Sequence, residues 1–214
     1  MAKRKGKSGG FLDSYELGGQ YLLRANIAKG RPSMIEATSS NGDSVVVRTW
    51  PRRGGDDEDL VDIWRHELRQ LHKLSGYPGA RKYIARIVDA GEDTKGFHIV
   101  IDAGQRVPLE TLLQRGRAST SWLRALTLPA NRRRLWSNLR SVACGLEILH
   151  TEGLVHRNLD GWAVLTSAGD DPDFQLTGFE WSLRLSAAAD TASSRPGPDI
   201  PSVSFANDWA DFAR

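Results

Sequence analysis

A polar loop between a long helix and a hairpin constrains the fold of this chain most strongly. Residues 132–152 carry apolar side chains at helical spacing, so they predict one long helix. Residues 153–162 break that period with glycine, asparagine and aspartate. Short apolar segments follow at residues 163–166 and 173–177, with a Gly-Asp-Asp-Pro turn between them. The predicted order is therefore helix, polar loop and β-hairpin.

The chain before the long helix is rich in strand-forming segments. Asn41-Gly42 lies between two of these segments and is a strong β-hairpin signal. Residues 57–74 carry an apolar stripe at helical spacing and predict one helix among the strands. We expect an α+β fold, in which an antiparallel sheet of five strands and one helix precede a mostly helical part. The five strands are predicted at residues 21–27, 33–38, 44–50, 84–89 and 97–101.

Composition excludes several classes of protein. The 214 residues are 40% hydrophobic and 26% charged, which is ordinary for a globular protein. Cys144 is the single cysteine, so the chain has neither an internal disulfide framework nor a cysteine-based zinc site. The sequence contains no run of ~18 apolar residues, so it predicts no transmembrane helix. The basic N-terminus lacks the apolar core of a secretory signal. We therefore expect a cytoplasmic protein with no membrane partner.

Clustered arginines leave a nucleic-acid-binding protein open as a weaker alternative. They gather at the ends of the irregular connection 116–131, but no interleaved aromatic platform accompanies them. The net charge of +3 is mild and does not by itself indicate a nucleic-acid partner. Nucleic acid is therefore not expected as a partner, and a steep salt dependence of binding would support the alternative. The arginines are Arg115, Arg117, Arg132, Arg133 and Arg134.

Several motifs, taken in order, resemble those of eukaryotic-type serine/threonine protein kinases. His156-Arg157-Asn158 and Ala163 lie where the catalytic loop of that family has His-Arg-Asp and a later Asn. Gly178-Phe179-Glu180 lies where the family has Asp-Phe-Gly. Val45-Val46-Val47-Arg48 lies where it has Val-Ala-Ile-Lys, and Glu67 matches the helix glutamate that pairs with that lysine. The resemblance implies the two-lobe kinase fold.

The resemblance implies ATP as the cofactor to consider and a set of positions for binding it. A bidentate Arg48–Glu67 salt bridge is expected to hold this part of the chain together even without nucleotide. Arg48 keeps the positive charge of the family's lysine but presents a planar fork in place of a compact ammonium. The implied positions are Ala28 and Gly30 in a worn glycine-rich loop, Arg48 and Glu67 as the ion pair, and Asp102 and Gly104 at the hinge.

The residues that carry the chemistry in the family are replaced here. Asn158 stands in place of the aspartate that accepts the substrate hydroxyl's proton, and an amide has no carboxylate basicity. Ala163 and Gly178 stand in place of two magnesium ligands, and neither offers a side-chain oxygen. No catalytic set is intact, and Mg²⁺ binding is not expected. The resemblance is therefore to a degenerate kinase, a pseudokinase acting as a regulatory or interaction module.

A divergent, active serine/threonine kinase remains the alternative. Asp160 lies two residues past Asn158, and Glu180 lies two residues past Gly178. A rearranged site would use Asp160 as the base and Glu180 as a metal ligand. Transfer of phosphate to a generic substrate with magnesium or manganese would separate the two classes.

The resemblance also divides the chain into parts. It implies a basic tail at residues 1–14, a kinase-like N-lobe at 15–102 and a partial C-lobe at 103–214. Residues 207–212 resemble the start of the family's large central helix, in which an aspartate normally bonds the catalytic loop. The resemblance thus implies a C-terminally truncated kinase fold. We expect a missing C-terminal segment or a protein partner to cover the face left exposed.

Overall fold

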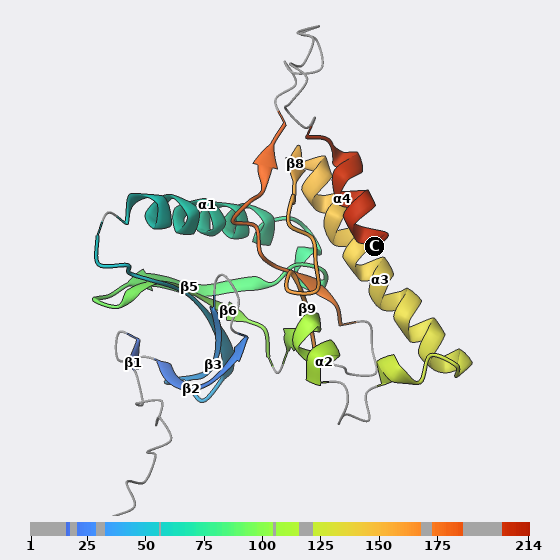
Figure 1. The fold of residues 1–214 in the computed structure, drawn as a ribbon, viewed down its shortest axis with the longest axis horizontal. Helices are drawn as coiled ribbons and strands as arrows, with labels where there is room; N and C mark the ends of the chain where they lie inside the picture. Colours follow the sequence, from blue (N-terminus) through green and yellow to red (C-terminus); the bar gives the residue numbers. More distant parts are fainter. Residues whose placement is uncertain are drawn as a thin grey trace, which may run out of the picture.

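An antiparallel sheet forms the first half of the fold (Figure 1). The computed structural model describes residues 16–17, 21–28, 33–55, 57–104, 106–115, 122–167, 173–185 and 203–214. The sheet has six strands in the order β1-β2-β3-β4-β6-β5. Their bounds are Glu16–Leu17 (β1), Tyr21–Ala28 (β2), Ser33–Ser39 (β3), Ser44–Pro51 (β4), Arg86–Glu92 (β5) and Gly96–Asp102 (β6).

The sheet has one strand more than the sequence predicts. The five predicted strands correspond to β2 through β6, and β3 and β4 meet at the Asn41-Gly42 turn. The added strand, β1, is two residues long and pairs antiparallel with β2. A strand of that length carries no readable period-2 alternation, so sequence reasoning has no signal for it.

One helix, α1 (Glu58–Ser75), lies along β5 and β6 (Figure 1). Its buried face presents Leu60, Glu67, Leu71 and Leu74, which follow helical spacing. Trp64 fixes the helix to the sheet, because its Nε1 donates to the carbonyl of His98 at 3.1 Å. The predicted helix at residues 57–74 is confirmed almost to the residue.

The second half is mostly helical and also holds two small antiparallel sheets. The long helix α3 (Pro129–Thr151) begins ahead of the predicted Arg132, because proline is well suited to the first helical turn. The helix α4 (Phe205–Phe212) lies beside α3, with the rings of Phe205 and His150 4.6 Å apart (Figure 1). The other elements are η1 (Ala80–Lys82), β7 (Val107–Pro108), α2 (Leu109–Arg115), η2 (Trp122–Arg124), β8 (Leu154–Val155), β9 (Val164–Thr166), β10 (Gln175–Leu176) and β11 (Leu183–Arg184).

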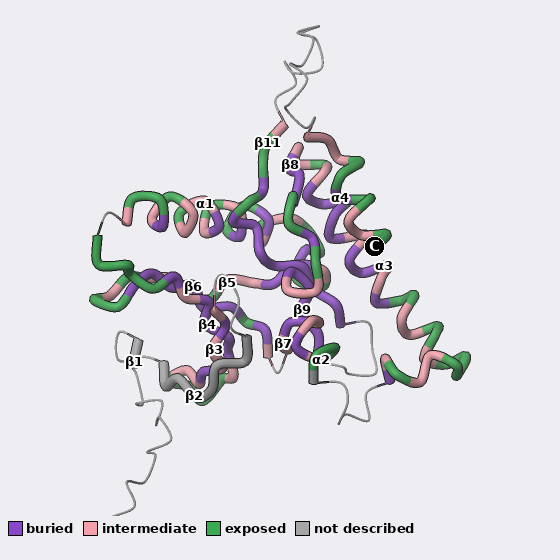
Figure 2. The backbone as a smooth tube through the Cα atoms, viewed as in Figure 1, coloured by how far each residue is buried: buried purple, intermediate pink, exposed green. Residues whose placement is uncertain are grey.

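The two halves share one apolar core (Figure 2). Leu176 of β10 joins them: its N–H donates to Tyr83 at 2.8 Å, and its carbonyl accepts from Ala85 at 2.9 Å. Gly145 of α3 packs directly against Leu176, and a Cβ at this glycine would lie only 2.7 Å from Leu176 Cδ1. The predicted hairpin of β9 and β10 is thus clamped between α3 and the segment before β5.

Some predictions fall outside the described residues. These are the basic tail at residues 1–14, Gly30 of the predicted glycine-rich loop, the connection at 116–121 and the hairpin turn at 168–172. Within the part of the chain that the structure describes, no helix has both the length and the apolar character needed to cross a bilayer.

Candidate functional site

A buried cluster of one arginine and two glutamates lies between β4, α1 and the segment after β10. Arg48 Nη1 forms an ion pair with Glu67 Oε1, and Arg48 Nη2 lies 3.1 Å from Glu180 Oε2. The side chains of Arg48, Glu67 and Glu180 are 2%, 0% and 4% exposed. The predicted pairing of Arg48 with Glu67 is therefore present, but its predicted bidentate form is wrong, because Arg48 Nη2 pairs with Glu180 and Glu67 Oε2 is left without a partner among the described residues. Its partnership with Glu180 is an addition that the sequence reasoning did not foresee.

Local structure explains why these three side chains meet. Arg48 lies in the buried run of β4, opposite Met34 of β3 and Ile99 of β6. Glu67 lies on the buried face of α1, so its carboxylate points at the sheet. An unpaired charge in such surroundings is very costly, and each group therefore needs an opposite partner. The planar guanidinium suits this role, since its two Nη ends pair with separate carboxylates.

The cluster holds more negative than positive formal charge. Arg48 contributes one positive charge, whereas Glu67 and Glu180 contribute one negative charge each. Arg48 Nη1 also donates to Thr177 Oγ1 at 3.5 Å, a long bond. Glu67 Oε2 is buried and has no hydrogen-bond partner among the described residues. Arg48 Nε is also buried without a hydrogen-bond partner among the described residues, so both signs of the cluster are incompletely satisfied, which is unusual for buried polar groups.

The polar loop at residues 156–163 is fixed by Asp208 of α4. Asp208 Oδ2 accepts from the N–H of His156 at 2.7 Å, and Oδ1 accepts from the N–H of Arg157 at 2.9 Å. Nε2 of His150 also lies 2.9 Å from Asp208 Oδ2. Asp208 is fully buried. The resemblance predicted that an aspartate of residues 207–212 bonds this loop, and the structure identifies it as Asp208.

His156 connects the loop to the segment that carries Gly178 and Glu180. Its Nε2 lies 3.0 Å from the carbonyl of Thr177, and its Nδ1 lies 3.3 Å from the N–H of Asn158. A carbonyl only accepts and an amide N–H only donates, so the ring is neutral with its proton on Nε2. Complete burial lowers the pKa of His156 and outweighs the opposing bond to Thr177. The histidine is therefore a neutral structural link.

Arg157 and Asn158 turn outward from this link. Arg157 adopts a left-handed backbone conformation, with φ of 67°, which a non-glycine residue rarely holds. Both side chains are exposed. Asp160 follows and is exposed as well, but its Oδ1 accepts from the N–H groups of Trp162 at 2.8 Å and Ala163 at 3.1 Å. Its carboxylate therefore closes a local turn.

Ala163 and Gly178, which the kinase resemblance matches to two metal-ligand positions, lie side by side. The N–H of Thr177 donates to the carbonyl of Ala163 at 2.9 Å. A Cβ at Gly178 would lie 3.6 Å from Ala163 Cβ and 3.7 Å from Glu180 Oε2. Gly178 has φ of +81°, a conformation in which glycine meets no steric penalty. The structure thus brings both positions next to the Arg48 cluster.

The other positions predicted to bind nucleotide make contacts with other residues of the chain. Asp102 is exposed at the end of β6, and its Oδ2 accepts from Arg86 at 2.9 Å. Gly104 accepts from Ser44 Oγ at 3.4 Å through its carbonyl. Ala28 is the last residue of β2 and pairs with Met34. The assignment of these residues to ATP remains a prediction.

His66 of α1 holds the segment beside Glu180. Its Nε2 lies 3.0 Å from Ser182 Oγ, and that hydroxyl donates to the carbonyl of Phe179 at 2.7 Å. The hydroxyl has a single proton, so His66 Nε2 is the donor in the first contact. Burial lowers the pKa of His66, against the raising effect of the Ser182 backbone. Two sequence signals point to the pairing of Arg48 with Glu180. A glutamate follows Phe179, and an arginine stands at position 48 in place of lysine.

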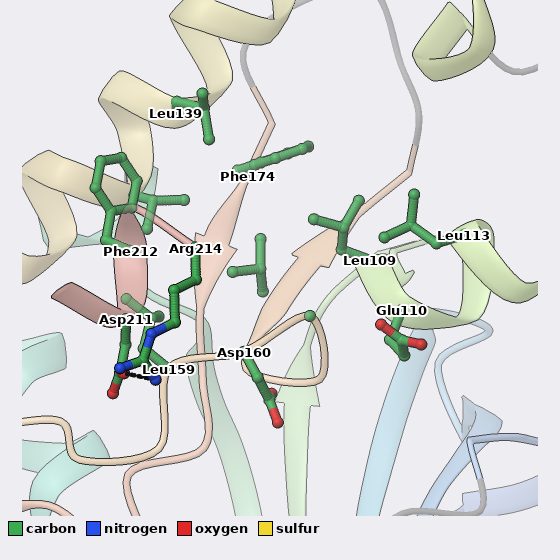
Figure 3. A pocket seen from close by; sticks show the side chains of 13 residues that line it. Leu109, Glu110, Leu113, Leu139, Leu159, Asp160, Phe174, Asp211, Phe212 and Arg214 are labelled. Carbon is green, nitrogen blue, oxygen red and sulfur yellow. Dashed lines mark ion pairs between the residues drawn. The ribbon is translucent and has the colours of Figure 1, made fainter. Parts of the chain in front are cut away.

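An apolar cavity of about 540 Å³ lies apart from the Arg48 cluster, between α2, α3 and residues 159–161. Figure 3 shows apolar side chains such as Leu139, Phe174 and Phe212 around it, with the carboxylates of Asp160 and Glu110 on its lower side in this view. None of the three cluster residues lines it. Within the described ranges, no group of three or more His, Cys, Asp or Glu side chains is arranged to hold a metal ion.

Comparison with known proteins supports a kinase-like family. No protein-family profile matches the chain. It is 27% identical over 185 residues, 85% of its length, to the serine/threonine-protein kinase PknL of Mycobacterium tuberculosis, of which the match covers 42%. It is 26% identical over 147 residues, 67% of its length, to the calcium-dependent protein kinase 26 of Oryza sativa, of which the match covers 24%. The chain therefore spans less than half the length of these relatives.

Proposed function

We propose that this kinase-like chain is a pseudokinase, a regulatory or interaction module that does not transfer phosphate. The observation that carries the proposal is the pairing of Ala163 with Gly178. These residues stand at the two metal-ligand positions, lie in contact range of each other and offer no side-chain oxygen. Magnesium requires hard oxygen ligands in near-octahedral geometry. The site therefore lacks the groups that would hold a metal against a triphosphate.

Charge at the site supports the same proposal. Phosphoryl transfer depends on positive charge placed where negative charge develops on the transferred group. Arg48 supplies positive charge here, but both ends of its guanidinium face carboxylates of the protein itself. Asn158, at the position of the base, is an amide and has no basicity to accept a proton. The metal site, the catalytic base and the positive charge available to a phosphate are thus all weakened.

The retained contacts favour a stable scaffold. Asp208 and His156 bind the loop to α4 and to Thr177 with short hydrogen bonds. Such a network keeps a surface in one shape whether or not chemistry occurs on it. A scaffold of this kind suits a module whose activity is to bind a protein partner.

The alternative, an active kinase that uses Asp160 and Glu180, would have to release both residues from other contacts. Asp160 Oδ1 already accepts two backbone N–H groups of its own turn. Glu180 is buried and faces Arg48. A base and a metal ligand taken from these positions would disrupt the turn and the buried cluster.

A phosphate-transfer assay tests the proposal. The purified chain is incubated with ATP labelled on its γ-phosphate, a generic protein substrate, and magnesium or manganese. We expect no transfer above that of a heat-denatured sample. Transfer that is lost in Asp160→Asn would instead establish the active-kinase alternative.

A further inference from the structure

Glu180 is the unexpected member of the buried cluster. It approaches Arg48 from a segment 132 residues further along the chain, with Oε2 at 3.1 Å from Nη2. Glu67 already occupies the other end of the guanidinium. A guanidinium fork binds carboxylates and phosphates through the same paired N–H geometry. The second carboxylate therefore takes a place that an external anion would otherwise fill.

We propose that Glu180 is an internal ligand of Arg48 that closes an anion site to phosphate-bearing molecules such as nucleoside triphosphates. The inference deepens the proposed function, on which it rests, by stating how the same site is regulated. The site opens when the Glu180 carboxylate is removed or displaced. In the closed state the chain holds its fold without nucleotide, because its own carboxylate occupies Nη2 of the arginine.

The charge of the cluster supports this closure. With Glu180 in place, one arginine faces two carboxylates, and one oxygen of Glu67 already lacks a hydrogen-bond partner among the described residues. A phosphate added to this cluster would meet net negative charge at short range, in surroundings that screen charges poorly. Without Glu180, Arg48 and Glu67 form a neutral pair, and Nη2 is free to donate to an anion.

The contacts around Glu180 explain how it is held in place. Phe179, its neighbour, is fully buried and packs its ring 5.3 Å from that of His156. On the other side, the N–H and hydroxyl of Ser182 both donate to the carbonyl of Phe179, and His66 binds that hydroxyl. A tight turn anchored at both ends thus presents the Glu180 carboxylate to Arg48.

Three variants test the proposal. Glu180→Ala removes the carboxylate and leaves space, whereas Glu180→Gln keeps the shape and removes the charge. Asp62→Asn is the matched control, because it removes one negative charge from an exposed position of α1 outside the cluster. ATP binding is measured by titration calorimetry without divalent metal, after circular dichroism has established that each variant is folded.

We expect Glu180→Ala to bind ATP at least about tenfold more tightly than the unaltered chain, a change of ~1.4 kcal/mol. Glu180→Gln should lie between the two, and Asp62→Asn should match the unaltered chain. Inorganic phosphate should raise the unfolding temperature of Glu180→Ala more than that of the unaltered chain. Stabilisation of a poorly folded Glu180→Ala by phosphate supports the proposal equally.

Equal ATP affinity for the unaltered chain and a folded Glu180 variant would overturn the role of Glu180. Tightening in Asp62→Asn as large as in Glu180→Ala would overturn it too, since any loss of negative charge would then suffice. Phosphate transfer is measured on the same samples. Transfer by the unaltered chain overturns the proposed function, whereas the affinity ranking alone decides the role of Glu180.

Discussion

Two buried acidic networks in this molecule differ in how completely they are satisfied. Around Asp208, one carboxylate faces donors from His150, His156 and Arg157, at 2.7–2.9 Å. Around Arg48, two carboxylates share one guanidinium, and Glu67 Oε2 has no hydrogen-bond partner in the described part of the chain. The first network has the form of a permanent brace. The second has the form of a site in which one carboxylate is exchangeable for another anion.

The largest effect is expected from removing the cation of the second network. Arg48→Ala leaves Glu67 and Glu180 buried without an opposite charge. Breaking a buried ion pair in this way costs about 3–5 kcal/mol of unfolding free energy. Urea denaturation followed by circular dichroism measures the change.

Arg86→Ala is the matched control for this prediction. Arg86 also forms an ion pair across neighbouring strands, with Asp102, but the two side chains are 42% and 46% exposed. An exposed pair of this kind contributes about 0–1 kcal/mol. Equal losses for the Arg48 and Arg86 variants would show that the buried cluster contributes no more than a surface pair.

A somewhat smaller loss is expected in the first network. Asp208→Ala removes the acceptor of two buried backbone N–H groups and the partner of His150. Unsatisfied buried donors cost about 1–3 kcal/mol each, so we expect a loss of ~3 kcal/mol once the loop has relaxed. The same urea denaturation experiment measures the loss.

Asp208→Asn refines the comparison of the networks. The amide keeps one oxygen for an N–H group, so about half of the loss should be recovered. ATP affinity should stay at the level of the unaltered chain in both Asp208 variants, because Arg48 keeps both partners. A gain in affinity in either Asp208 variant would contradict the separation of brace and site.

The sequence predicted the network around Asp208 better than the network around Arg48. The order of motifs shared with kinases predicted that an aspartate of residues 207–212 bonds the loop, and the structure identifies it as Asp208. The pairing of Arg48 with Glu67 was also predicted, because the two positions match the lysine and the helix glutamate that pair in the kinases that the chain resembles. Both are cases where burial leaves few alternatives for a polar group.

Glu180 shows where sequence reasoning ended. Its place after Gly178 suggested a metal ligand, whereas the structure buries it against an arginine 132 residues earlier in the chain. Which partner a buried carboxylate finds depends on the backbone path, here set by a glycine with φ of +81° at position 178. Likewise β1 is too short to leave a pattern in the sequence. In these places the sequence indicated the chemistry of the individual residues, but not which residues pair in the tertiary structure.

The smallest expected effect is a dependence of stability on pH that comes from the link between brace and site. Burial lowers the pKa of His156 below its ordinary value of 6.5. The unfolded chain therefore binds a proton on this residue as the pH falls through 6.5, while the folded chain keeps the ring neutral. Below this pH the unfolded state holds more protons, so the free energy of unfolding falls with acidity, by at most ~1.4 kcal/mol per pH unit for one proton.

Comparing unfolding free energies at pH 5 and pH 7 isolates this contribution. His66 and His98 also have pKa values lowered by burial, so the unaltered chain should lose stability through all three rings. His156→Gln should reduce the difference between the two pH values, since its amide cannot titrate, whereas the exposed His72→Gln should leave the difference unchanged. An unaltered difference in His156→Gln would mean that the ring takes up a proton inside the folded protein. The assignment of His156 as a neutral link between Asn158 and Thr177 would then be wrong. The distinction between a fixed Asp208 network and an exchangeable Arg48 cluster would be wrong as well.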